Sequence, residues 1–146
     1  MGTPESLRDL ALSLNNVGRV AERRDDLEEA DRYFQESLKI SRELADSLGT
    51  PESLRDLALS LNNVGLVAHR RGDSELGKQC SEESLKIFRE LADLLGTHRA
   101  IEDLKGALLN HALVARGLSN SVLAVLAKQL EAEMSGLETT VVDNQP

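Results

Sequence analysis

Apolar residues recur in steps of three and four along the first 23 residues, the spacing of one face of an α-helix. This first stripe consists of Leu7, Leu10, Ala11, Leu14, Val17, Gly18 and Ala21. A polar break at residues 24–26 precedes a second stripe of Leu27, Ala30, Phe34, Ser37, Leu38, Ser41, Leu44 and Ala45. Two helical stripes joined by a short polar break predict an antiparallel helical hairpin.

The hairpin pattern is repeated along the chain. Residues 2–48 align without a gap on residues 49–95, and the first seventeen residues of each copy read GTPESLRDLALSLNNVG. A weaker third copy begins at residue 96. We therefore predict one domain over residues 1–138, made of units 2–48, 49–95 and 96–138, with residues 139–146 as a flexible tail.

Residues at the unit boundaries indicate where the helices begin and end. Thr3 and Thr50 each precede a proline, which combines a hydroxyl cap with a first helical residue whose missing N–H is not needed. Gly49 and Gly96 follow the second helices of their units, where a glycine commonly ends a helix. In the third unit we expect the helices near residues 98–116 and 121–137.

Composition narrows the class of protein. The chain has 146 residues and a net charge of −8, which disfavours a protein that coats nucleic acid or an anionic membrane surface. No apolar run approaches the roughly 18 residues needed to span a bilayer. Cys80 is the single cysteine, so no internal disulfide can form, and with no secretory signal we expect a cytoplasmic protein.

The small and aromatic residues of the first unit resemble the tetratricopeptide repeat. The matching residues are Leu14-x2-Val17-Gly18-x2-Ala21, followed by Ala30-x3-Phe34. The resemblance implies an all-α fold, a right-handed α-solenoid of three antiparallel helical hairpins. The Leu-Asn-Asn-Val-Gly string and the long helices are most similar to the kinesin-light-chain type of repeat, in which stacked hairpins hold a peptide along a concave surface.

The later units depart from this pattern. Gly77 and Ser81 replace the alanine and the aromatic residue of unit one, and we expect them to loosen the second helix of unit two. Lys105 and His111 fall on the apolar stripe of unit three, where unit two has Ala58 and Val64. We therefore expect unit three to close the array, because terminal units of solenoids are atypical.

The resemblance implies that first-helix residues beside the apolar stripe line the inner surface and bind peptide. By register, these residues are Asn15, Arg19, Glu22, Asn62, Leu66, His69, Leu109, Leu113 and Arg116. Asparagine side chains both donate and accept hydrogen bonds, so Asn15 and Asn62 are suited to hold the backbone of an extended peptide. The alternative is that they, or the adjacent Asn16, Asn63 and Asn110, bond only helix backbone or water.

Nothing in the sequence favours catalysis or a bound cofactor. His69, His98 and His111 come from different positions of the repeat, and no spacing typical of a zinc site occurs. Arg19 and Arg116 are separated by a whole unit, so they do not form a clamp for one carboxylate. We expect no enzyme activity, no metal and no cofactor.

We therefore interpret the chain as a protein–protein interaction module that binds an extended peptide of a protein partner. The alternative is an oligomerisation or spacer module, or part of a longer repeat array. The alternative rests on Leu7, Leu10 and Leu14, which lie on a first helix with no capping helix before it. That arrangement favours a homo-oligomer formed through the first helix.

Overall fold

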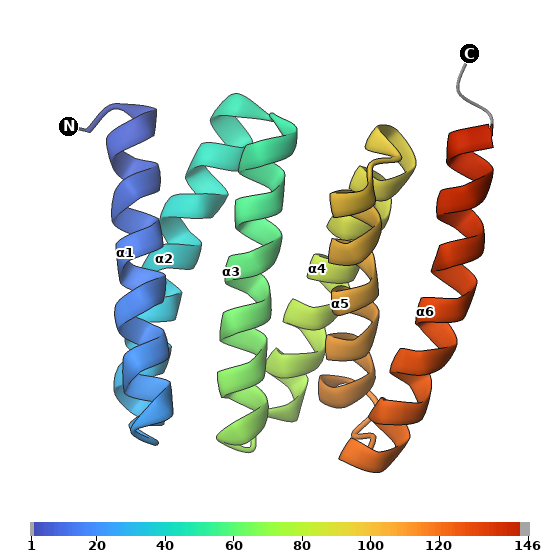
Figure 1. Ribbon diagram of the computed structural model, residues 1–146. Coiled ribbons are helices and arrows are strands. Elements are labelled where there is room, and N and C mark those ends of the chain that lie inside the picture. Colours follow the sequence, from blue (N-terminus) through green and yellow to red (C-terminus); the bar gives the residue numbers. More distant parts are fainter. Residues whose placement is uncertain (1, 144–146) are drawn as a thin grey trace.

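A computed structural model describes residues 2–143, with side chains to residue 136, and this part of the chain contains six helices and no strand. The helices are α1 (Pro4–Arg23), α2 (Leu27–Leu48), α3 (Pro51–Arg70), α4 (Ser74–Leu95), α5 (His98–Val114) and α6 (Asn120–Asp143). Consecutive helices are antiparallel and stack along one direction (Figure 1). The predicted all-α solenoid is confirmed.

Residues at the unit boundaries begin and end the helices as predicted. The Thr3 hydroxyl accepts a hydrogen bond from the Ser6 backbone N–H at 3.1 Å, and Thr50 caps α3 in the same way. Gly49 ends α2 in the left-handed region, with φ of 59°. That conformation is strained for residues with a side chain, which explains the glycine.

The helices form two layers in the first two units. The first helices α1, α3 and α5 lie in one layer, with α2 and α4 behind them (Figure 1). α2 packs between α1 and α3, and α4 packs between α3 and α5. Neighbouring first helices also touch each other, and Arg42 on α2 donates to the Glu83 carboxylate on α4 at 2.7 Å.

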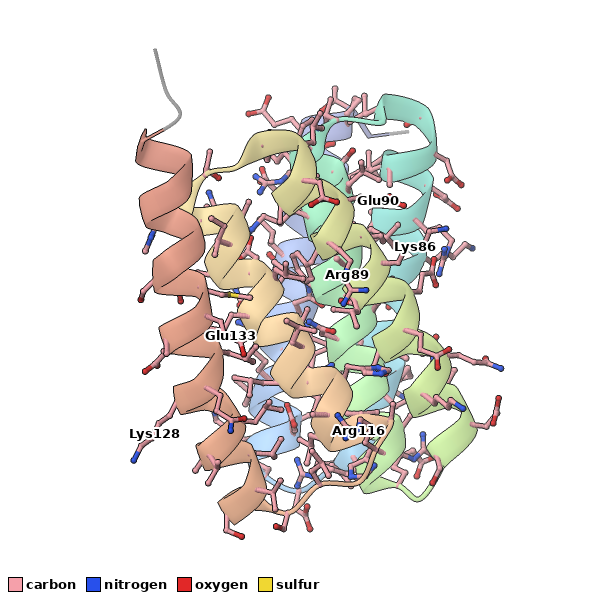
Figure 2. The ribbon with its side chains drawn as sticks, turned by 90° about the vertical axis from the view of Figure 1, so that its right-hand side faces the viewer. Lys86, Arg89, Glu90, Arg116, Lys128 and Glu133 are labelled. Atoms are coloured by element: carbon pink, nitrogen blue, oxygen red, sulfur yellow. The ribbon has the colours of Figure 1, made fainter. Side chains whose placement is uncertain are left out.

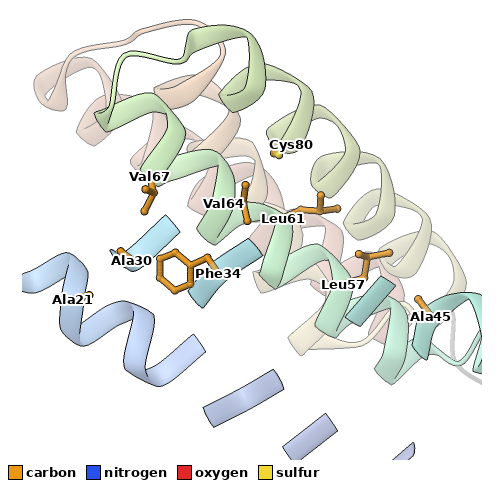
Figure 3. Packing of buried hydrophobic residues seen from close by; sticks show 9 residues of the cluster. All are labelled: Ala21, Ala30, Phe34, Ala45, Leu57, Leu61, Val64, Val67 and Cys80. Carbon is orange, nitrogen blue, oxygen red and sulfur yellow. The ribbon is translucent and has the colours of Figure 1, made fainter. Parts of the chain in front are cut away.

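A continuous apolar core joins units one and two. Ala30 and Phe34 from α2 share a buried cluster with Leu57, Leu61, Val64 and Val67 from α3 (Figure 3). Phe34 also lies against Gly18, where a Cβ atom would come within 2.5 Å of the Phe34 ring. Gly18 therefore permits the close approach of α1 and α2 that the repeat pattern indicates.

Unit three has different helix bounds from those expected. α5 ends at Val114, and α6 continues to Asp143 instead of ending near residue 137. Gly136 does not adopt the positive φ that ends α2 and α4, and no proline lies between residues 137 and 143 to interrupt the helix. Residues 144–146 of the expected tail lie outside the described residues.

The core of unit three is smaller than that between units one and two. Ile101, Leu130 and Met134 form its buried cluster. α5 lies between α4 and α6, which do not contact each other (Figure 2). Lys105 takes the place of the buried Ala58 and donates to Glu131 on α6 at 3.3 Å. A polar contact thus replaces part of the apolar interface in this last hairpin.

The space left by the small residues of unit two is filled from unit three. A Cβ atom at Gly77 would lie 2.9 Å from the Val114 side chain, and the Ser81 hydroxyl lies 3.3 Å from Nδ1 of His111. Gly77 and Ser81 are both buried. In unit two, Val114 and His111 of α5 therefore occupy part of the space that the Phe34 side chain fills in unit one.

Candidate functional site: the inner face of the first helices

The first helices place one row of side chains at equivalent positions of the three units. Arg19 on α1, Leu66 on α3 and Leu113 on α5 form this row. Arg19 is exposed, and the two leucines are half-buried. The row therefore changes from cationic in unit one to apolar in units two and three.

The asparagines lie at the contacts between neighbouring first helices. Asn62 Oδ1 accepts a hydrogen bond from Asn110 Nδ2 at 2.9 Å. Asn15 and Asn63 are the equivalent pair one unit earlier, and Asn15 Oδ1 and Asn63 Nδ2 are buried without a hydrogen-bond partner. Asn15 is only 8% exposed. The bond between the asparagines uses only the amide oxygen of Asn62, and its amide nitrogen is left as a donor.

Ion pairs also link neighbouring first helices. Arg8 bonds Asp56 with an Nε to Oδ2 distance of 2.6 Å, and Arg55 bonds Asp103 with the same geometry one unit later. The hydrogen bond that Arg8 donates to Asp56 raises the pKa of the Arg8 guanidinium, which stays charged. Glu22, predicted to face a peptide, accepts from Arg70 at 3.1 Å.

The other predicted residues have different surroundings. His69 is half-buried near the end of α3, and Arg116 is exposed beyond the end of α5. Leu109 packs against the cluster of Ile101, Leu130 and Met134. Leu109 therefore contributes to the α5–α6 core, whereas its equivalents Asn15 and Asn62 lie at contacts between first helices.

A groove lies at each junction between units. The first has a volume of about 420 Å³ and apolar walls formed by Leu12, Leu44, Leu48 and Leu59. Arg8 and Asp56 also line this groove. The second junction carries a groove of about 370 Å³ lined by the equivalent residues Arg55, Leu91, Leu95 and Asp103.

Sequence reasoning missed the groove residues. Leu12 and Leu59 occupy equivalent positions on α1 and α3, outside the apolar stripe that defines the core face. An apolar residue repeated at a position outside that stripe was the available signal. Gly106 holds this position on α5, so the apolar wall is not repeated there.

The described residues offer little chemistry for catalysis. They contain no group of three or more histidine, cysteine or acidic side chains that could hold a metal ion. Burial raises the pKa of the Cys80 thiol to about 11, so little nucleophilic thiolate forms near neutral pH. None of the described helices is long and apolar enough to cross a membrane.

Comparison with known proteins assigns the repeat. No curated protein sequence is significantly similar to the chain. Residues 9–61 match the family described as tetratricopeptide repeat, and this segment covers most of α1, all of α2 and the first half of α3. Repeats of this family are generally protein–protein interaction modules and typically non-enzymatic scaffolds that bind protein partners. Residues 9–61 of the chain therefore contain a tetratricopeptide repeat.

Proposed function

We propose that the chain binds an extended peptide segment of a protein partner along the inner face of α1, α3 and α5. The observation that carries this proposal is the pair of grooves at successive unit junctions, which share an arginine, an aspartate and two second-helix leucines at equivalent positions. Repeated grooves suit an extended chain, because its side chains also recur at regular spacing. The residues of the proposed face are those predicted above, together with the groove leucines.

The proposed contacts divide between peptide side chains and peptide backbone. Leu12 and Leu59 offer apolar walls to a side chain that enters the first groove. The free amide donor of Asn62 and the exposed guanidinium of Arg19 are suited to backbone carbonyl groups. Backbone contacts carry no sequence information, so specificity would come from the side chains that fit the grooves.

The test begins with an array of extended peptides, from which one binder is chosen for titration against the full chain. Leu12→Asp should weaken its affinity by roughly tenfold or more, because a carboxylate would replace an apolar wall of the groove. Leu94→Asp is the matched control, since Leu94 is 72% exposed on α4, outside the inner layer. Equal affinity of the Leu12→Asp variant and the parent would contradict the proposal.

The asparagines need a separate variant. Asn15→Ala combined with Asn62→Ala should weaken the same peptide while circular dichroism shows the helices intact. If the folded double variant binds as the parent does, the asparagines have no part in the proposed face, and their role is confined to packing between helices.

A second candidate function is oligomerisation or spacing through α1. Leu10, Val17 and Val20 favour it, because all three are more than two-fifths exposed on this helix. Light scattering across a concentration series tests it. A mass that rises with concentration, and that Val17→Asp returns to the monomer value, would support assembly, whereas a constant monomer mass would contradict self-association.

A further inference from the structure

Three apolar residues that are buried on α3 have identical, exposed counterparts on α1. Leu57, Val64 and Val67 of α3 are 5%, 0% and 0% exposed. Their equivalents on α1 are Leu10, Val17 and Val20, with exposures of 47%, 46% and 44%. The difference arises because α2 packs on this side of α3, whereas the described residues place only α2 and α3 against α1, on its other sides.

α2 shows what fits this surface. Its residues Phe34 and Ala45 share the buried cluster with Leu57, Val64 and Val67 (Figure 3). Where the two helices cross, the Ser41 hydroxyl lies 3.1 Å from the Ser60 hydroxyl, and both serines are buried. Ser13 is the exposed equivalent of Ser60 on α1. We call Leu10, Ser13, Val17 and Val20 the α1 strip.

Polar residues beside the α1 strip match a preceding first helix. On α3, Asp56 accepts a hydrogen bond from Arg8, and Arg70 donates one to Glu22. Both ends of α3 are therefore paired with α1. The equivalents of Asp56 and Arg70 on α1 are Asp9 and Arg23, which are exposed. An arginine and a glutamate fourteen residues apart, as in α1 itself, would pair with them.

The far end of a second copy does not supply this complement. On α5, Glu102 and Arg116 occupy the positions of Arg8 and Glu22. Their charges are reversed, so a second copy stacked head to tail would place Glu102 near Asp9 and Arg116 near Arg23. Like charges at a contact of this kind are unfavourable.

We propose that the α1 strip is a docking surface for a helical hairpin of the unit-one type, supplied by a partner. The second helix of that hairpin has aromatic and small residues spaced as Phe34, Ser41 and Ala45 are. Its first helix has an arginine and a glutamate spaced as Arg8 and Glu22 are. This inference rests on the second candidate function, assembly through α1, and names the partner.

The probe is a synthetic peptide with the sequence of residues 26–49, closed by a hydrocarbon staple between positions 39 and 43. Both positions are exposed in α2, so the staple holds the helix without touching the packing surface. Fluorescence anisotropy of the labelled peptide against the full chain should show saturable binding to one site. Val17→Asp in the chain should weaken that binding by roughly tenfold or more.

One control variant accompanies this test. Val125→Asp, at an exposed valine on α6, should bind the peptide as the parent does. Absence of binding, or binding that Val17→Asp leaves unchanged, would overturn the inference, since the second result means that the peptide occupies a site other than the α1 strip. A chain that self-associates through Val17 and excludes the peptide would uphold assembly through α1 but overturn the proposed partner.

Discussion

Gly18 and Phe34 illustrate how one residue sets the distance between two helices. The Phe34 ring is fully buried, and a Cβ atom at Gly18 would come within 2.5 Å of it. At Gly65 the added atom would meet the Cys80 Cβ at 3.1 Å, a milder contact. The same repeat position therefore tolerates a side chain less well in unit one than in unit two.

This difference predicts the effect of alanine at three glycines. Gly18→Ala should lower the free energy of unfolding by about 1–3 kcal/mol through overpacking, and Gly65→Ala should lower it less. Gly106→Ala is the control, because no atom lies within 4 Å of the added Cβ. It should raise stability by about 1 kcal/mol through helix propensity. Urea denaturation measures all three, and equal effects at Gly18 and Gly106 would contradict the crossing at Gly18.

Cys80 predicts a loss of stability at alkaline pH. Burial raises the pKa of the folded thiol to about 11 from its ordinary value of 9.0. The stabilising effect is complete below the unfolded pKa and is lost as the pH rises from 9 towards 11, because only the unfolded chain releases the proton in that range. By pH 10.5 the parent should lose about 2 kcal/mol more than the Cys80→Ala variant.

Denaturation curves of the parent and the Cys80→Ala variant between pH 8 and 10.5 measure this difference. The comparison cancels the titration of other groups that the two chains share. Parallel pH profiles would mean that the folded thiol ionises as readily as the unfolded one.

At the level of helices, α1 and α3 have nearly the same sequence in different surroundings. Helix formation needs only the local signals, so both copies begin at a threonine cap and run for 20 residues. The burial of their side chains depends on neighbouring helices. Of the two, only α3 packs against a second helix on each side, α2 and α4. Matched substitutions in the two copies therefore separate local from tertiary effects.

Val17→Asp and Val64→Asp provide this comparison. Val64→Asp should cost about 3 kcal/mol or more, or abolish folding, because it buries an unpaired carboxylate. Val17→Asp should change stability by less than about 0.5 kcal/mol, because the carboxylate remains in water. Thermal melts followed by circular dichroism at low protein concentration check both values. A similar loss in both variants would show that the exposed side of α1 is covered in solution.

Across the whole molecule, the apolar core thins towards the C-terminal hairpin. The cluster between units one and two includes four fully or nearly fully buried aliphatic residues of α3, whereas α6 contributes Leu130 and Met134 to a separate small cluster. Units of a solenoid stabilise one another mainly through neighbouring interfaces. We therefore expect stability to vary along the array.

Hydrogen exchange measured by mass spectrometry checks this gradient. Amides of α6 should exchange through local opening at least tenfold faster than amides in the middle of α3, which lose protection only when the core opens. The middle of α1 should be intermediate, because one of its sides is exposed. Equal protection of α6 and α3 would mean that the three units open as a single cooperative block.

The fold was largely predictable because its signals are local and repeated. Within one unit, a helix start is marked by Thr3, a close helix crossing by Gly18 and a helix end by Gly49. Gly77 was harder to interpret, since its effect depends on Val114, which comes from the next unit. The end of α6 was placed too early because no local residue stops that helix.

The candidate site was less predictable. Register alone placed the predicted residues on the first helices, but it could not show that Glu22 pairs with Arg70 or that Leu109 packs against α6. These contacts depend on how far neighbouring units are rotated against each other. The repeated pairs of Arg8 with Asp56 and Arg55 with Asp103 became visible only once that rotation was known.

Those two ion pairs also bear on how such a gene can change length. Each joins residues 48 apart, although the sequence repeats every 47, so unit two uses Arg55 towards unit three and the adjacent Asp56 towards unit one. Recombination between the identical stretches 2–18 and 49–65 would remove one complete unit and bring Arg8 opposite Asp103. The new junction would inherit a matched ion pair, so the array can gain or lose units without any compensating mutation at the seam.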